Sequence, residues 1–437
     1  MKFHAFWPMA IVWALPVHAA VHHSSDLGWK PGQDVTEAFA KLLEAGRLKA
    51  GDQLVLDHTY KISGSHALPD DFILSAVKGA GFDVTDAAEP NDNRPLLELG
   101  DRNTLRNLTI TYLNTPPLGP TGEEPGKTFT RRLGIQASDK SNLLIENCRL
   151  VGSIGHHLKL ADCSKPSVIG THIAGGHWSV YLLSVTDPVF RHCLIEKCQG
   201  DGIKTGNSGG KAVRGALVEH CVFQDNLRDG IDTTGGFNNS VVRDTIFRRM
   251  RVSGMDLKSH YESKSGRITD LEPENVGIRV ERCLFHDMPN AIVLTTIDGG
   301  RRKGPGNELL NAGNIRAYAP HEIDISDCVF GHVEKPLRPK GQGGYGVNYP
   351  SEEGEHMRVF HHKDAYSIRY RNAHVFGQRI RLVRIASIGG SRHLSKQAAD
   401  ALDHSITGTV VDKPAPPVKP GMTNAPIECG PQTLEQP

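Results

Sequence analysis

One recurring position in this chain holds most of the side chains that could transfer a proton or bind an anion. Along the chain that position is occupied by Lys159, Tyr181, Lys204, Asp232 and Asp256. A lysine acts as a base when enough of it is neutral, and a like charge nearby, such as Lys159, favours the neutral form of Lys204. A tyrosine can exchange a proton with a departing oxygen. These residue types predict acid–base chemistry on a negatively charged substrate.

The position recurs because the middle of the chain consists of copies of one phrase. Each copy has a cysteine or threonine at the same place, in a cysteine column made of Cys148, Thr171, Cys193, Cys221, Thr245, Cys283 and Cys328. The first four steps in this column are 23, 22, 28 and 24 residues, without a helical period. Short strands repeating at this spacing are typical of a solenoid. We predict an all-β fold, a single right-handed parallel β-helix of about eight to eleven coils.

A second phrase follows each member of the cysteine column and sets the direction of the side chains. Its apolar residues should form one inward ladder, because successive side chains of a strand alternate between faces. The predicted ladder is Leu158, Val180, Ile203, Ile231, Met255 and Ile292. The residue after each ladder member must then point outward, which defines an outward column of Gln136, Lys159, Tyr181, Lys204, Asp232, Asp256 and Val293. Glu98 extends this column by one coil, and Lys258 lies on the same face.

The insertions between repeats all follow the strand that carries the outward column. They span 114–130, 206–214, 259–275 and 297–320. Insertions collected on one side of a solenoid commonly wall a binding groove, so we expect the outward column to form its floor. Besides Lys159, three cations are predicted to meet acidic groups of a ligand there, namely Lys211, Arg214 and Lys258. His157, or its neighbour His156, could contact sugar.

The composition and the N-terminal segment together indicate an exported globular protein. The chain has 437 residues, with 50 Lys or Arg against 49 Asp or Glu and a net charge of +1. This balance argues against a nucleic-acid partner or a polybasic membrane surface. Residues 1–19 resemble a secretory signal, and no later segment is apolar for long enough to cross a bilayer. We therefore expect a secreted or periplasmic monomer.

The two ends differ from the repeats. An amphipathic segment beginning at Asp34 predicts a helix that caps the open end of the solenoid. Residues 340–402 lose the repeat and are expected to form a C-terminal cap or an irregular wall, so the catalytic domain is placed at 20–402 and a Pro-rich tail at 403–437. The cysteine column points inward with its side chains parallel, which favours reduced thiols over disulfides.

Several of these features together resemble a known family. The capping helix, the coils and the phrase Gly200-Asp201-Gly202-Ile203-Lys204-Thr205 are similar to the parallel β-helix polysaccharide lyases, most closely the alginate lyases of polysaccharide lyase family thirty-one. The resemblance covers roughly residues 28–330. It implies β-elimination in a uronate polymer such as alginate, with Lys204 and Tyr181 as the acid–base pair. It carries no strong expectation of a metal ion.

The residue types suit that reaction. A lyase removes the C5 proton beside a uronate carboxylate, expels the O4 oxygen and needs positive charge to stabilise the enolate-like intermediate. We assign Lys204 as base and Tyr181 as acid, with exchanged roles as the alternative and Lys258 as the reserve base. Asp232 and Asp256 either orient Lys204 or share a calcium ion.

Other functions remain open at this stage. A glycoside hydrolase would require two clustered carboxylates, for which Asp232 and Asp256 are the candidates. A uronate epimerase begins with the same deprotonation, but the Asp-Pro-His-Asp phrase that we associate with that family is missing; the nearest segment is Asp187-Pro188-Val189-Phe190. A noncatalytic adhesin or carbohydrate-binding β-helix would not need a Lys–Tyr pair.

Overall fold

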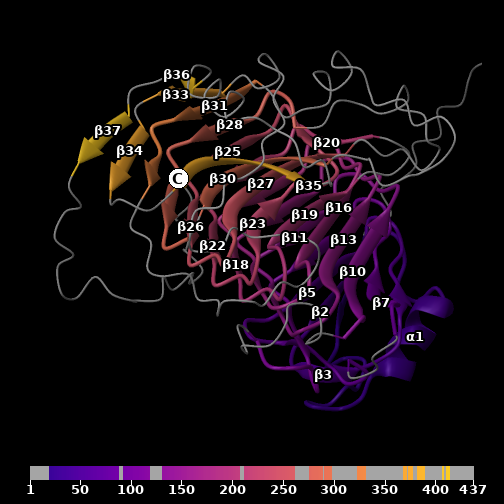
Figure 1. Ribbon diagram of the computed structural model, residues 1–437. Coiled ribbons are helices and arrows are strands. Elements are labelled where there is room, and N and C mark those ends of the chain that lie inside the picture. Colours follow the sequence, from indigo (N-terminus) through magenta and orange to yellow (C-terminus); the bar gives the residue numbers. More distant parts are fainter. Residues whose placement is uncertain are drawn as a thin grey trace, which may run out of the picture.

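The chain forms one long solenoid of parallel strands (Figure 1). The computed structural model describes residues 19–87, 92–118, 130–206, 211–260, 275–288, 290–297 and 322–330, with five further strands between 368 and 413. A coil contributes up to one strand to each of three sheets, which contain 13, 12 and 10 strands in the described chain. The all-β prediction is confirmed, and the stack is longer than the predicted eight to eleven coils.

The bounds of the elements follow the stacking order. Sheet 1 contains β1 (Val21–His23), β2 (Gln53–Leu56), β5 (Ile73–Ala76), β8 (Thr104–Arg106), β11 (Leu144–Glu146), β14 (Ser167–Ile169), β17 (Val189–Arg191), β21 (Leu217–Glu219), β25 (Val241–Arg243), β28 (Arg279–Glu281), β31 (Ile323–Ser326), β33 (Ile368–Arg371) and β36 (Ile406–Thr407). Sheet 2 contains β3 (Thr59–Ile62), β6 (Gly81–Val84), β9 (Thr109–Tyr112), β12 (Arg149–Val151), β15 (His172–Ala174), β18 (Leu194–Glu196), β22 (Val222–Gln224), β26 (Ile246–Arg248), β29 (Leu284–His286), β32 (Val329–Phe330), β34 (Ala373–Phe376) and β37 (Val410–Lys413).

Sheet 3 carries the outward column. It contains β4 (His66–Ala67), β7 (Pro95–Glu98), β10 (Leu133–Ser138), β13 (His156–Ala161), β16 (Val180–Leu183), β19 (Ile203–Gly206), β23 (Asp229–Asp232), β27 (Ser253–His260), β30 (Asn290–Ile297) and β35 (Arg381–Ile388). A separate pair, β20 (Val213–Arg214) and β24 (Phe237–Asn238), lies beyond its edge. The helix α1 (Thr36–Glu44) lies at the N-terminal end of the stack (Figure 1).

The cysteine column marks the corner between sheets 1 and 2. The residue before each member adopts a left-handed conformation, with φ of 53° at Asn147, 55° at His192 and 53° at His220. One residue in this conformation turns the chain sharply between two strands. The next side chain then points into the core, which explains why a small buried thiol or hydroxyl repeats there.

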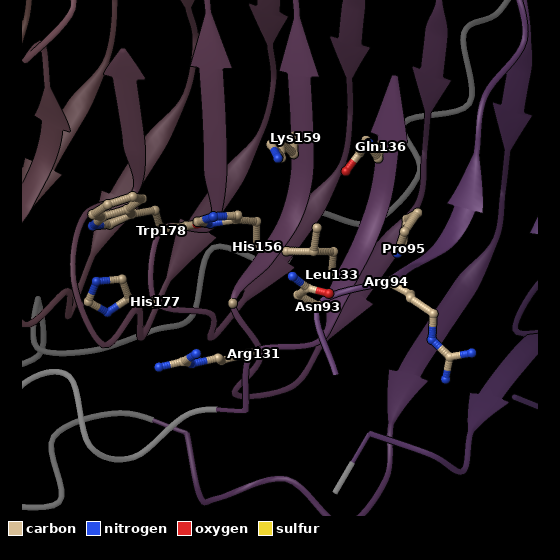
Figure 2. Close-up of a pocket in the computed structure, with 11 residues that line it drawn as sticks. Asn93, Arg94, Pro95, Arg131, Leu133, Gln136, His156, Lys159, His177 and Trp178 are labelled. Carbon is tan, nitrogen blue, oxygen red and sulfur yellow. The ribbon is translucent and has the colours of Figure 1, made fainter. Parts of the chain in front are cut away.

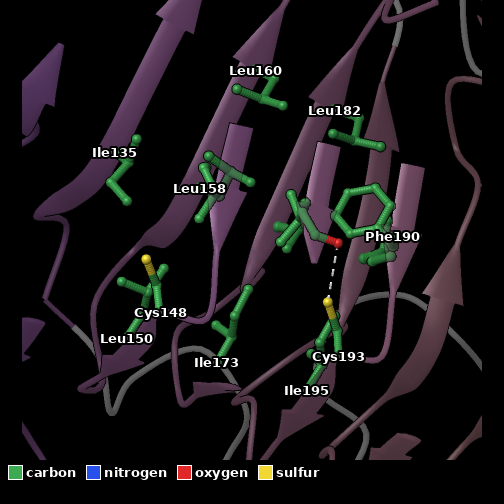
Figure 3. Close-up of a cluster of buried hydrophobic side chains, with 14 of the residues drawn as sticks. Ile135, Cys148, Leu150, Leu158, Leu160, Ile173, Leu182, Phe190, Cys193 and Ile195 are labelled. Atoms are coloured by element: carbon green, nitrogen blue, oxygen red, sulfur yellow. Dashed lines mark hydrogen bonds between the residues drawn. The ribbon is translucent and has the colours of Figure 1, made fainter. Parts of the chain in front are cut away.

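The predicted inward ladder is confirmed in every step. Leu158 pairs with Val180, and the register continues without a slip through Ile203, Ile231, Met255 and Ile292. All of these side chains are fully buried, and Figure 3 shows part of this core beside the thiols of Cys148 and Cys193. The outward column is therefore also in register, from Glu98 to Val293.

The N-terminal cap forms as predicted. Phe39 and Leu42 of α1 are buried against the first coils, where Phe39 packs 6.0 Å from Phe82 and 6.2 Å from Trp29 between ring centroids. Among the described residues, no helix is both long and apolar enough to span a membrane.

The C-terminal part differs from the prediction. The strands β33 to β37 continue all three sheets as far as Lys413, past the predicted boundary at residue 402. These strands lack the repeated phrase, so their alternation alone could not be aligned with the earlier coils. The signal segment, most of the inserted walls and the end of the tail lie outside the described residues.

The thiols support a test in solution. All seven described cysteines are buried and unbonded, and burial raises the pKa of Cys148 and Cys198 to about 12. We expect the native protein to resist a thiol reagent, because all seven thiols are buried, and the denatured, unreduced protein to react at all seven positions. Absence of free thiols after denaturation would contradict this arrangement.

Candidate functional site

Two columns of side chains meet along sheet 3. The outward column presents Lys159, Tyr181 and Lys204 on adjacent strands. A second set, here called the corner column, stands three residues earlier in each coil and consists of His156, Trp178, Asp201 and Asp229. Because adjacent coils lie about 4.8 Å apart, side chains of both columns can contact each other across coils.

Trp178 is the centre of this contact network. Its ring stacks on His156, with centroids 5.4 Å apart and an interplanar angle of 13°, and lies 5.1 Å from the ring of Tyr181. The ammonium group of Lys204 lies 5.5 Å from the centre of the indole. The attraction of a cation to an aromatic face therefore helps to hold Lys204 beside the two rings.

Two glycines make this position of Trp178 available. Gly175 and Gly176 have φ of 90° and 85°, a conformation that L side chains rarely adopt. A Cβ at Gly175 would lie 2.5 Å from the carbonyl oxygen of Gly152. The Gly-Gly pair therefore lets the chain turn tightly over the preceding coil before Trp178.

Lys204 is held by hydrogen bonds to its own neighbours. Its Nζ donates to Asp232 Oδ2 at 2.5 Å and to the hydroxyl of Thr234, and it lies 3.9 Å from Asp201 Oδ2. Only 8% of the residue is exposed. An ammonium group in these bonds keeps its protons engaged, so the geometry favours Lys204 as a fixed positive charge.

Three buried carboxylates surround this charge. Asp201, Asp229 and Asp232 each have an oxygen within 4.8 Å of the others, and all three are fully buried. They form the acidic group within the described chain whose spacing could hold a metal ion. The chain's own cations already contact it, because Arg228 lies 3.6 Å from both Asp201 and Asp232 in addition to Lys204.

Tyr181 lies in the outward column beside this charged cluster. Burial raises the pKa of its phenol above the usual value, so the side chain is protonated at neutral pH. The phenol lies over the backbone of Gly206, where a Cβ would be only 2.7 Å from the tyrosine oxygen. Tyr181 is thus a protonated donor in a defined position.

A pocket of about 540 Å³ lies over β7, β10 and β13 of sheet 3 (Figure 2). Its polar and charged lining includes Arg94, Arg131, Lys159 and His156, and Trp178 closes one end. None of the described residues that line it is acidic. Lys159 and Arg131 have no ion-pair partner in the described part of the chain, so the pocket suits an anionic ligand.

The predicted sugar contact of His157 is wrong. The side chain is buried, with Nε2 3.0 Å from the carbonyl oxygen of Gly152 and 3.1 Å from that of Ala174. The cause is local, because the amides of both His157 and Leu158 donate to the carbonyl of Ser179 and the backbone does not alternate strictly here. His156 therefore faces the pocket and His157 faces the interior.

The remaining predicted residues lie further along the groove. Lys211 and Arg214 are exposed near β20, where Ser184 donates to the Lys211 carbonyl oxygen. Asp256 follows Asp232 in register but is not part of the three-carboxylate group. Lys258 lies on β27 in register with Thr295, and its side chain is outside the described residues.

Sequence reasoning named His156 only as an alternative to His157, and it missed the rest of the corner column and Arg131 as a set. A signal for the column was present, since the position three residues before each outward residue carries His156, Trp178, Asp201 and Asp229 in succession. Strict alternation would assign that position to the interior, because it is separated from the outward residue by an odd number of steps. Only the corner backbone reveals that both positions point outward.

Comparisons with known proteins agree with the fold. A family model described as the right-handed beta helix region matches residues 99–265, and no curated protein matches the chain. Polygalacturonase from Erwinia carotovora ssp. carotovora is similar, with 13% identity, 87% of this chain and 97% of that chain covered and a TM-score of 0.52. PfbA, a surface adhesin of Streptococcus pneumoniae, is 11% identical, with 84% of this chain and 91% of that chain covered and a TM-score of 0.56. The exopolygalacturonase from Thermotoga maritima is 11% identical, with 84% of this chain and 91% of that chain covered and a TM-score of 0.50.

At such low identity these similarities bear on the fold alone. The chain is a right-handed parallel β-helix, an architecture it shares with polygalacturonases and with a surface adhesin. Function must therefore be argued from the side chains of the groove.

Proposed function

We propose that this protein cleaves a uronate-containing acidic polysaccharide by β-elimination, with alginate as the first substrate to test. The observation that carries the proposal is a cationic, aromatic pocket whose lining residue Trp178 contacts both Tyr181 and Lys204. The uronate carboxylates of a bound polymer would contact Lys159 and Arg131, while its sugar rings would pack on Trp178.

The site divides the reaction between its residues. Tyr181 gives a proton to the O4 leaving oxygen, which its raised pKa allows because the phenol remains protonated until needed. Lys204 supplies positive charge to the carboxylate as the enolate-like intermediate develops. This assignment replaces the base role predicted for Lys204 from the sequence, and it needs no calcium ion.

Hydrolysis is a weaker explanation of the same groove. A hydrolase needs carboxylates that reach the sugar, as an acid and as a base or nucleophile. Asp201, Asp229 and Asp232 are fully buried, and Lys204 and Arg228 contact them. Their arrangement is better suited to holding Lys204 than to attacking a glycosidic bond.

The test compares the products of the two reactions. Purified protein is incubated with alginate, polygalacturonate and other uronate polymers, while near-ultraviolet absorbance and new reducing ends are both measured. Elimination produces unsaturated uronate together with reducing ends, whereas hydrolysis produces reducing ends alone. Neither signal with any of these polymers would favour a noncatalytic binding protein. We also propose that the protein is secreted and acts as a monomer.

The pocket cations yield a prediction about binding. Charge reversal in Lys159→Glu or Arg131→Glu should raise KM roughly tenfold, equivalent to about 1.4 kcal/mol, with a smaller change in turnover. Binding of the wild-type protein to polymer should also weaken as salt screens the groove. Lys165→Glu, an exposed substitution outside the pocket lining, serves as the control. Affinity that does not change with ionic strength would contradict the cationic groove.

A further inference from the structure

We propose that His156 is the base that removes the C5 proton, an assignment that rests on the β-elimination proposed above. Its ring forms part of the pocket wall beside Trp178 (Figure 2) and lies 5.1 Å from the ring of Tyr181, at an angle of 38°. A uronate ring placed over the two side chains can present C5 to the imidazole and O4 to the phenol.

The tautomer of His156 follows from one hydrogen bond. Nδ1 lies 3.0 Å from the carbonyl oxygen of Trp178. A carbonyl oxygen only accepts, so Nδ1 carries the hydrogen and Nε2 carries the lone pair. Nε2 is therefore the nitrogen whose lone pair a ligand in the pocket would meet.

The surroundings keep the imidazole neutral. Burial, with a smaller effect of the charge on Lys159, lowers the pKa of His156 to about 4, so the ring is neutral at neutral pH and one ring nitrogen keeps its lone pair. A bound uronate carboxylate adds negative charge near the ring and thereby strengthens it as a base. Lys204 has its protons engaged by Asp232 and Thr234, so it does not compete for this role.

The proposed step balances without another reactant. His156 Nε2 takes the C5 proton, and the electron pair of the C5–H bond becomes the C4–C5 double bond. The C4–O4 bond breaks with its electron pair on O4, which takes the proton of Tyr181. The imidazolium and the phenolate then return to their starting forms by proton exchange with water.

The experiment measures unsaturated uronate formation by wild-type protein and by His156→Gln, His156→Ala and His172→Gln. His172 pairs with Glu196 on sheet 2 and is the matched control. We expect both His156 variants to lose about 10²-fold or more in turnover while polymer binding stays within severalfold, and His172→Gln to be normal. Added imidazole should restore part of the activity of His156→Ala, since that variant leaves space for it.

Three results would overturn the assignment while leaving the lyase proposal intact. One is a His156→Gln protein within tenfold of wild-type turnover, and another is a loss in His156→Ala that lies in polymer binding and does not respond to imidazole. A dominant effect of His177→Gln, the other histidine of the pocket, would likewise transfer the role to His177. If wild-type protein forms no unsaturated product from any uronate polymer, the proposed function fails and the base assignment falls with it.

Discussion

Tyr181→Phe should lower turnover about 10²-fold or more while leaving polymer affinity and thermal stability nearly unchanged. The substitution removes one hydroxyl, and no described residue hydrogen-bonds to it. The phenylalanine ring can keep the contacts with His156 and Trp178, whose centroids both lie 5.1 Å away. The loss should therefore fall on proton donation to O4 and not on binding.

Steady-state kinetics on a uronate polymer, together with a melting curve and a binding isotherm, would separate these effects. A variant with normal affinity and melting temperature but greatly reduced turnover supports Tyr181 as the proton donor. Near-normal turnover would show that another group, or water, protonates the leaving oxygen. A large fall in affinity with unchanged turnover would reduce Tyr181 to a packing surface for sugar.

The repeat and the inward ladder could be predicted from sequence because they depend on properties that act locally. Alternation along a strand fixes which side chain faces the core, and the apolar series from Leu158 to Ile292 repeats that rule in each coil. Once one register is set, parallel stacking places Tyr181 beside Lys204 without further information. The pairing of Tyr181 with Lys204 could therefore be predicted from the sequence.

The conformation of the corner of sheet 3 could not be predicted from the sequence in the same way. In the coil of His156 its conformation depends on two successive amides sharing the Ser179 carbonyl, a contact between coils that no local pattern encodes. This contact places His156 in the pocket and His157 in the interior. From the sequence, the base proposed here was consequently only the alternative to its buried neighbour.

The role of Lys204 could not be predicted from the sequence either. Its position predicted a groove lysine, but its partners come from residues 28 and 30 positions later, Asp232 and Thr234. Distances of this kind, and the approach of Asp201 across the corner, decide whether a lysine donates or accepts a proton. The fold could be derived from periodicity, whereas the chemistry required the three-dimensional contacts.

Lys204→Met should abolish most turnover and also destabilise the protein. The substitution removes the positive charge proposed to stabilise the intermediate, and it leaves the buried Asp232 with the guanidinium of Arg228 3.6 Å away. Loss of one partner of a buried ion pair costs about 3–5 kcal/mol, and the proximity of Arg228 should keep the loss at the lower end. Lost activity alone would therefore be ambiguous between chemistry and stability.

The double variant Lys204→Met/Asp232→Asn resolves that ambiguity. Neutralising both members removes the unpaired buried charge, so much of the stability should return while turnover stays about 10²-fold or more below wild type. Lys258→Ala, the reserve position on the same face, should retain activity. If the double variant recovers turnover together with stability, Lys204 and Asp232 serve only the fold. If Lys258→Ala is inactive while Lys204→Met is active, the catalytic centre lies two coils further along sheet 3.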